Sequence, residues 1–292
     1  MVTTHEMQIE GQKLVALSFN PNTPGTSIIL LHGITISVHS WTPDQTSLFT
    51  EKGPCYALSL PGHYPAAFPD HFQQESLTAE MMARVLTAAI RQLVGNQPVA
   101  LVGHSTGGFA ALDIAAHAPE VPRCIISVSG FAQGQWAGAL KFNQWLVRRG
   151  FLGKLFFKME YKLNRSVRAW HRASLRFYVA NPRRLFAYPH LDAVIDSNLP
   201  SFRRLDLDAM VQYFAAMPDI DISPLLPRIT APTLVLTGDS DPIVPPAQSH
   251  LIAEKTPRAD LVVMKGVGHF PPFESPAEYQ QVVGEWLHRQ LN

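Results

Sequence analysis

The sequence predicts an α/β protein with a mostly parallel sheet of about eight strands, helices on both faces and an inserted helical segment. Three observations lead to this fold class. Short, continuously apolar runs alternate with helix-forming runs, as expected for strands buried on both faces of a parallel sheet. The pentapeptide Gly103-His104-Ser105-Thr106-Gly107 joins one apolar run directly to a helix-forming run. After Gly130 the alternation stops for about a hundred mainly helical residues and resumes at Thr233.

Length and composition limit the class of protein before any motif is considered. A chain of 292 residues with 46% hydrophobic residues can bury a large core, as one domain or as one domain with a sizeable insertion. No stretch of about 18 apolar residues occurs, and residues 1–6 lack the basic and apolar regions of a secretory signal. We therefore expect a soluble protein of the cytoplasm.

The cysteines and histidines give no sign of a metal site. Cys55 and Cys124 each lie beside an apolar run, where a small buried thiol is the ordinary role, and we expect no disulfide. The chain has neither a Cys-x-x-Cys pair nor a His-Glu-x-x-His motif, and its histidines are scattered. We therefore expect no metal and no cofactor.

The expected elements follow the chain in order. Residues 7–9 and 14–19 flank Gly11 and predict a β-hairpin. Apolar runs predict core strands at residues 27–31, 56–60, 99–102, 124–128, 233–237 and 261–264. Helices are expected at residues 43–51, 77–93, 109–117 and 276–291. The core is then expected to comprise residues 1–130 and 228–292, and the helical insertion residues 131–227.

Ser105 lies where a strand is expected to turn sharply into a helix, which is the pattern of a nucleophile elbow. A serine held at a strained backbone angle needs neighbours without Cβ atoms, so that strand and helix can pass closely. Gly103 and Gly107 meet this need. The pattern therefore predicts a serine hydroxyl that is pushed out at the edge of the sheet.

An elbow of this kind predicts an acid and then a histidine, each just after a later strand. Asp241 follows the expected strand at residues 233–237, and His269 follows the one at residues 261–264 within a glycine-flanked loop. Asp239 precedes Asp241 by two residues and is a competing candidate for the acid, with capping of the loop as its alternative role.

These motifs together resemble the α/β-hydrolase fold family, over nearly all of the chain except the insertion. The resemblance rests on Leu31-His32-Gly33-Ile34 after a strand, the elbow at Ser105, the Gly-x-x-Asp loop ending at Asp241, and Gly268-His269. In serine members of this family, the elbow serine attacks an acyl carbon, the histidine takes its proton, and the acid orients the histidine. The insertion in such members is a helical cap, or lid, over the active site.

The resemblance implies a role for each motif in this chain. Ser105 is then the nucleophile, His269 the general base, and Asp241 the acid, because the family places its acid three residues after this glycine. The backbone N–H groups of Ile34 and Thr106 form the oxyanion hole. His32 and His104 belong to the family motifs and are expected to form hydrogen bonds or to pack rather than to carry protons.

The nucleophile narrows the reaction. Epoxide hydrolases and haloalkane dehalogenases of this fold use aspartate at the elbow, so Ser105 indicates acyl chemistry. Hydrolysis of a carboxylic ester of an apolar substrate or lipid is expected first. Thioester hydrolysis, acyl transfer, carbon–carbon bond hydrolysis and perhydrolysis use the same groups and stay open, as does a receptor-like role without turnover. Residues 59–66 lack the acid and second glycine common in the family, which implies an altered loop near the site entrance.

The insertion is strongly basic. Residues 131–204 contain fourteen lysines and arginines against three acids, a balance of about +11 in a chain with a formal net charge of +1. Large apolar residues are interleaved with these charges, many at spacings of three and four, which predicts basic amphipathic helices. These apolar residues are Phe142, Trp145, Leu146, Phe151, Leu152, Leu155, Phe156 and Phe157.

Two interpretations of this basic segment are open. In the first, the apolar side chains pack on the core or line the pocket, and the cations form a solvated outer face. In the second, the segment contacts an anionic partner, either acidic membrane lipid at a peripheral site or a phosphate-bearing carrier. Nucleic acid is not an expected partner, because no recognition motif accompanies the charge. Nothing in the sequence indicates the oligomeric state.

Overall fold

The computed structural model describes residues 2–291, and its centre is one eight-stranded sheet in the order β1-β2-β4-β3-β5-β6-β7-β8. β1 pairs with β2 and β2 with β4 in antiparallel fashion, and all other pairs are parallel. This confirms the predicted fold class. The strands are β1 (Thr3–Ile9), β2 (Gln12–Phe19), β3 (Ile28–Leu31), β4 (Cys55–Leu58), β5 (Val99–His104), β6 (Pro122–Val128), β7 (Thr233–Gly238) and β8 (Ala259–Met264).

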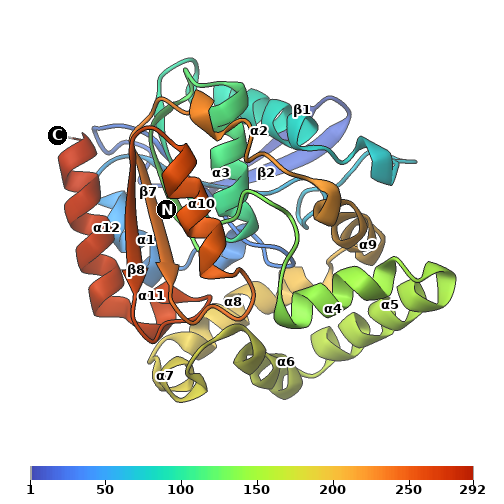
Figure 1. The fold of residues 1–292 in the computed structure, drawn as a ribbon. Helices are drawn as coiled ribbons and strands as arrows, with labels where there is room; N and C mark the ends of the chain where they lie inside the picture. Colours follow the sequence, from blue (N-terminus) through green and yellow to red (C-terminus); the bar gives the residue numbers. More distant parts are fainter. Residues whose placement is uncertain (1, 292) are drawn as a thin grey trace.

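The apolar runs are continuous because helices cover both faces of the sheet (Figure 1). In β3, Ile29 and Leu31 pack into the cluster that contains α2 (Ala79–Val94) and α3 (Thr106–His117). Ile28 and Leu30 point to the other face and pack with side chains of α1 (Pro43–Thr50) and α12 (Pro276–Leu291). Successive side chains of a strand alternate between faces, so burial on both sides favours apolar residues at most positions of a strand.

Most helix and strand boundaries lie within a few residues of the predicted ones. The difference that bears on the site is the start of α3. The predicted helix begins at Phe109, whereas the observed one begins at Thr106, directly after Ser105. Gly107 and Gly108 are poor helix formers, which favoured the later start. Close packing overrides this preference, since a Cβ atom on Gly107 would lie 2.2 Å from the carbonyl oxygen of Leu31.

Six α-helices lie between β6 and β7 and form one side of the molecule, below the sheet in Figure 1. They are α4 (Gly138–Val147), α5 (Gly150–Ser166), α6 (Arg168–Ser174), α7 (Pro182–Ala187), α8 (Leu191–Arg203) and α9 (Leu207–Ala216), with a 3-10 turn at Leu175–Tyr178. After this segment come α10 (Pro246–Lys255), on the same face as α3, and α11 (Pro271–Glu274), just before α12.

The apolar side chains of α4 and α5 divide between core and solvent. Leu146 and Phe157 are buried, as the first interpretation expects. For the other six residues named with them, that interpretation is wrong, because each is exposed by 43% or more. The reason is geometric: α5 buries only the stripe of Gly153, Phe157 and Tyr161, and the side chains beside this stripe point to solvent.

The two cysteines are not joined by a disulfide. Cys55 and Cys124 are buried free thiols. Among residues 2–291, no helix combines the length and the apolar character needed to cross a bilayer.

Candidate active site

Ser105 links β5 to α3 with a strained backbone. Its φ of 55° and ψ of −117° fall outside the regions that a serine ordinarily adopts. The chain can hold this turn because its neighbours lack side chains: a Cβ atom on Gly103 would lie 2.1 Å from the carbonyl oxygen of Gly107. A side chain at Gly103 or at Gly107 would therefore push β5 and α3 apart. The predicted strand-to-helix turn is present at Ser105.

The structure brings Ser105, His269 and Asp241 into one chain of hydrogen bonds. His269 Nδ1 lies 2.7 Å from Asp241 Oδ2, and His269 Nε2 lies 3.0 Å from Ser105 Oγ. A carboxylate only accepts, so Nδ1 carries the ring proton and donates it to Asp241. Nε2 is then the acceptor, and the Ser105 hydroxyl donates to it. All three side chains are buried, with relative exposures of 7% or less.

The two candidate acids have different surroundings. Asp241 Oδ1 accepts hydrogen bonds from the backbone N–H groups of Ile243 and Val244, at 2.8 and 2.9 Å, which turns Oδ2 toward His269. Asp239 is exposed and accepts from the Gly266 N–H and the Ser240 hydroxyl, both at 2.8 Å. The capping role is therefore the one that Asp239 has, and the hydrogen bond to His269 belongs to Asp241.

Two backbone N–H groups lie beside Ser105 without acceptors among residues 2–291, namely those of Ile34 and Thr106. Thr106 is the first residue of α3, where N–H groups have no partner within the helix. Ile34 follows Gly33, and a Cβ atom on Gly33 would lie 3.3 Å from Ser105 Cβ. Gly33, Ile34, Ser105 and His269 line the same cavity. The two residues predicted for an oxyanion hole therefore lie where they could donate to an oxygen next to Ser105.

His32 and His104 support this arrangement as neutral rings. Burial lowers the pKa of His32 and the pKa of His104, each to about 3. His32 Nε2 accepts from the Leu60 N–H at 3.1 Å, so its Nδ1–H donates to the Gly33 carbonyl at 2.8 Å. His104 Nε2–H donates to the carbonyl of His269 at 2.8 Å. One ring thus fixes the loop of Ile34 and the other fixes the loop of His269.

Glu274 is a part of the site that sequence reasoning missed. Its buried carboxylate accepts four backbone hydrogen bonds, from Gly268 and Phe270 on one oxygen and from Ala180 and Asn181 on the other, at 3.0 to 3.3 Å. It therefore joins the loop of His269 to the helical segment between α6 and α7. The only signal in the sequence is an acid within the apolar, proline-rich run after His269, which does not reveal its partners.

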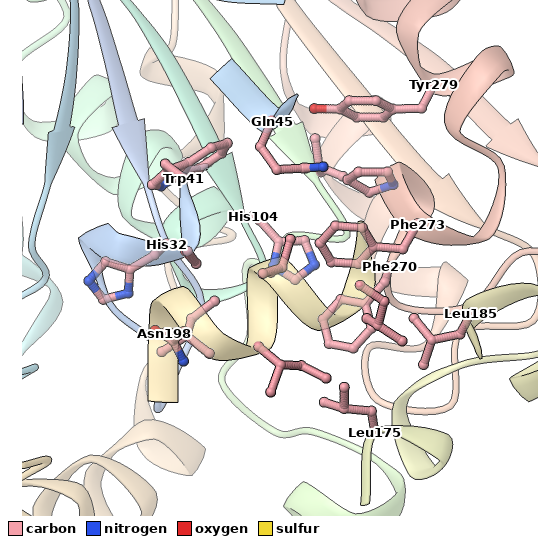
Figure 2. Close-up of a pocket in the computed structure, with 18 of the residues that line it drawn as sticks. His32, Trp41, Gln45, His104, Leu175, Leu185, Asn198, Phe270, Phe273 and Tyr279 are labelled. Atoms are coloured by element: carbon pink, nitrogen blue, oxygen red, sulfur yellow. The ribbon is translucent and has the colours of Figure 1, made fainter. Parts of the chain in front are cut away.

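Two adjoining cavities open next to these groups. The one that contains Ser105 and His269 has a volume of about 90 Å³. The other, of about 110 Å³, is lined mainly by aliphatic and aromatic side chains of the sheet, α8 and α11. Figure 2 shows the rings of Phe270 and Phe273 beside His104 in this second cavity. His104 and Phe270 line both cavities, so a molecule at Ser105 has an apolar space beside it.

The loop of residues 59–66 contacts the wall of the second cavity without lining it. The Leu60 N–H donates to His32, which lines that cavity. The loop also packs against the helical segment: the Tyr213 hydroxyl donates to the Pro61 carbonyl at 2.9 Å, and Arg204 donates to the Tyr64 hydroxyl at 2.8 Å. The altered loop sequence therefore serves contacts with α9 and the end of α8.

Known proteins resemble this chain over most of its length. Residues 28–282 match the model of the alpha/beta hydrolase family. The chain is 26% identical to the pimeloyl-[acyl-carrier protein] methyl ester esterase of Neisseria meningitidis serogroup C, over 86% of this chain and 89% of that protein. It is 24% identical to a proposed carbamate hydrolase, RutD, of Pseudomonas syringae pv. syringae, over 90% and 94%.

Solved structures show the same fold. A thermophilic esterase from Thermogutta terrifontis superposes with a TM-score of 0.72 and 21% identity, covering 99% of this chain and 100% of that one. The enol-lactonase from Burkholderia xenovorans LB400 superposes with a TM-score of 0.75 and 17% identity, covering 97% and 100%. Among residues 2–291, no three His, Cys, Asp or Glu side chains are grouped so that they could hold a metal ion.

Proposed function

The chain belongs to the alpha/beta hydrolase family, and from this we propose that it is a serine hydrolase that cleaves a carboxylic ester of a largely apolar substrate or lipid. The observation that carries the proposal is the chain of hydrogen bonds from Ser105 through His269 to Asp241. The names of two relatives, an esterase and a proposed carbamate hydrolase, support hydrolysis as the reaction class.

The proposed mechanism starts with the proton of Ser105. His269 Nε2 takes this proton while Ser105 Oγ attacks the carbonyl carbon, because a neutral hydroxyl is a poor nucleophile. Asp241 accepts from Nδ1–H and stabilises the imidazolium that forms. The negative charge moves to the carbonyl oxygen, where the N–H groups of Ile34 and Thr106 donate; one such donor is worth about 2.7 to 4 kcal/mol in the transition state.

The second half of the cycle reverses these roles. His269 gives its proton to the alcohol oxygen as the carbon–oxygen bond breaks, which leaves the acyl group on Ser105. A water molecule then transfers a proton to Nε2 and attacks the acyl carbon, and the acid is released when Ser105 regains its proton.

An apolar substrate is supported by the space next to Ser105. The larger cavity has side chains such as Leu175, Leu185 and Phe273 on its wall, and it adjoins the cavity of Ser105 through His104 and Phe270. An acyl or alkoxy chain in this space would bury apolar surface, at about 0.8 kcal/mol per CH₂ group. We also propose that residues 131–227 act as a cap, since Tyr161, Tyr178 and Phe202 of this segment line the cavity of Ser105.

Covalent labelling and ester turnover test the proposal together. A fluorophosphonate probe is expected to add one adduct to the protein, detected by intact-protein mass spectrometry, and none to Ser105→Ala. Turnover of p-nitrophenyl esters is expected to rise with acyl length until the chain outgrows the apolar cavity. A folded wild-type protein that stays unlabelled and turns over none of the esters would contradict the proposal.

Glu274→Gln is expected to weaken both the fold and turnover. The glutamine oxygen can still accept two N–H groups, but its amide nitrogen faces two donors and accepts neither. Losing hydrogen bonds to a charged group costs about 2 to 3 kcal/mol of unfolding free energy, and misplacement of His269 lowers kcat by about 10- to 100-fold. Urea unfolding and steady-state kinetics check both effects. Glu278→Gln is the matched control, because Glu278 is exposed and within residues 2–291 accepts a hydrogen bond only from Ser275 Oγ; an equal loss there would refute the assignment.

A further inference from the structure

The exposed apolar surface of the protein is concentrated in one place. Of the thirteen large apolar side chains exposed within residues 2–291, eleven belong to residues 142–177, on α4 to α6 and the following turn. Scattered single apolar residues are normal on a protein surface, whereas a contiguous group indicates an interaction site. Six of them form what we call the α5 apolar stripe: Phe151, Leu152, Leu155, Phe156, Met159 and Leu163.

The stripe follows from the helical spacing of α5. Gly153, Phe157 and Tyr161, four residues apart, are the buried side of the helix. Residues on the α5 apolar stripe recur at spacings of three and four on the side away from them, so they share one face. Phe151 is 78% and Phe156 60% exposed, so the stripe projects into solvent rather than into the core. Figure 1 shows α4 and α5 extending away from the sheet.

Cations without acidic partners flank this stripe. Lys154 and Lys162 lie on α5, Lys141 lies near the start of α4, and Arg149 directly precedes α5; none of the four forms an ion pair with another residue in the 2–291 range. Arg149 instead lies over the ring of Trp145, 4.7 Å from its centroid. Of the other ten cations of residues 131–204, four pair with acids, namely Arg148, Lys158, Arg168 and Arg172, and the remaining six have no acidic partner among residues 2–291. The positive charge near the stripe is therefore left for an external partner.

We propose that α4 and α5 form a docking surface for an anionic lipid bilayer, with the α5 apolar stripe inserted among the lipid chains and the four cations at the headgroups. A helix with an apolar face, flanking lysines and nearby tryptophan is typical of helices that lie in the membrane interface. A second copy of the chain is the less favourable occupant, because a twofold contact would bring the same uncompensated cations of both copies together.

The docking surface and the proposed catalytic site share one helix. Glu160, Tyr161 and Asn164 of α5 line the cavity of Ser105, while the neighbouring residues of the α5 apolar stripe point outward. The thickness of one helix, about 10 Å, then separates lipid from the cavity. This step rests on the proposed function: a docked enzyme takes its apolar ester from the bilayer instead of from water.

Vesicle co-sedimentation tests the docking surface without any need for turnover. Ser105→Ala protein is mixed with vesicles of phosphatidylcholine alone or of phosphatidylcholine with phosphatidylglycerol at low salt. Binding is expected only to the anionic vesicles. The pair Lys154→Gln and Lys162→Gln is expected to weaken it about 30-fold, at about fivefold per cation near the surface. The pair Lys52→Gln and Lys255→Gln removes the same charge elsewhere and is expected to have little effect.

A second pair of variants tests the apolar part. Phe151→Ser with Phe156→Ser is expected to reduce binding by at least about tenfold, while Phe151→Leu with Phe156→Leu retains most of it. Because both side chains are exposed, the same pairs made with Ser105 intact should keep the melting temperature and the turnover of a soluble short-chain ester unchanged. Equal binding to neutral vesicles, no binding, or equal loss in the Lys52 and Lys255 pair overturns the proposal. So does a dimer that the serine pair converts to monomers, because the face is then an interface between copies.

Discussion

Replacing Ser105 by alanine is expected to lower kcat by about 10⁶-fold and to leave KM for a soluble ester nearly unchanged. The Oγ atom is the group proposed to form the acyl-enzyme, and no other hydroxyl can replace it, because among residues 2–291 only Ser105 has a hydroxyl hydrogen-bonded to His269 Nε2. The oxyanion donors are backbone groups and survive the substitution, so a small residual rate above that of water is expected. Steady-state kinetics on a p-nitrophenyl ester measures the loss.

Thr106→Ala is the matched control for this prediction. Thr106 adjoins Ser105 and is also buried, but its proposed contribution is its backbone N–H, which alanine keeps. Alanine is also a good helix former at the start of α3. The kcat of Thr106→Ala is therefore expected to stay within a few-fold of the wild type. A Ser105→Ala protein that keeps more than about one per cent of the wild-type kcat would contradict the nucleophile assignment.

The sheet could be predicted almost completely because its signal is local. Each core strand is a short, mostly apolar run, because burial on both faces favours apolar side chains at most of its positions. The strand order could not be read in this way. β4 lies between β2 and β3, an arrangement set by a crossover connection and by long-range pairing of Ile28 with Cys55. Nothing in either four-residue run specifies that neighbour.

The candidate site shows the same contrast between residues in local motifs and residues whose role depends on long-range contacts. Ser105, Asp241 and His269 lie in short motifs whose glycines serve the local backbone, so their positions could be predicted one motif at a time. Glu274 has its role only because the segment around Ala180 returns to the loop of His269, about ninety residues later in the chain. A carboxylate that joins two distant loops has no motif of its own.

The α4 and α5 helices show a third limit. Spacings of three and four in the sequence indicate amphipathic helices, but two different sides of α5 have this spacing. The stripe with Phe157 is buried, and the stripe with Phe156 is exposed. Periodicity alone could not decide between them, because both contain large apolar residues. Packing of Phe157 against Phe214 of α9, with ring centroids 5.1 Å apart, decides which side faces inward.

Asp241→Asn is expected to lower kcat by about 10⁴-fold while the protein remains folded. The asparagine oxygen can still accept from the Ile243 and Val244 N–H groups, so the loop is held as before. Its amide nitrogen then faces His269 Nδ1 and donates to it. This reverses the tautomer: the ring proton moves to Nε2, which can no longer accept the proton of Ser105. Steady-state kinetics and a thermal melt measure the two effects.

Asp239→Asn provides the comparison that decides which acid is catalytic. It makes the same chemical change two residues away in the same loop, and the asparagine oxygen can keep its bonds to the Gly266 N–H and Ser240 hydroxyl. Because Asp239 is exposed and does not touch His269, kcat is expected to change by no more than a few-fold. The reverse pattern, with the large loss at Asp239, would mean that the loop rearranges in the working enzyme so that Asp239 and not Asp241 orients His269. Similar large losses at both positions would indicate that the geometry of the whole loop, rather than one carboxylate, controls the tautomer of His269.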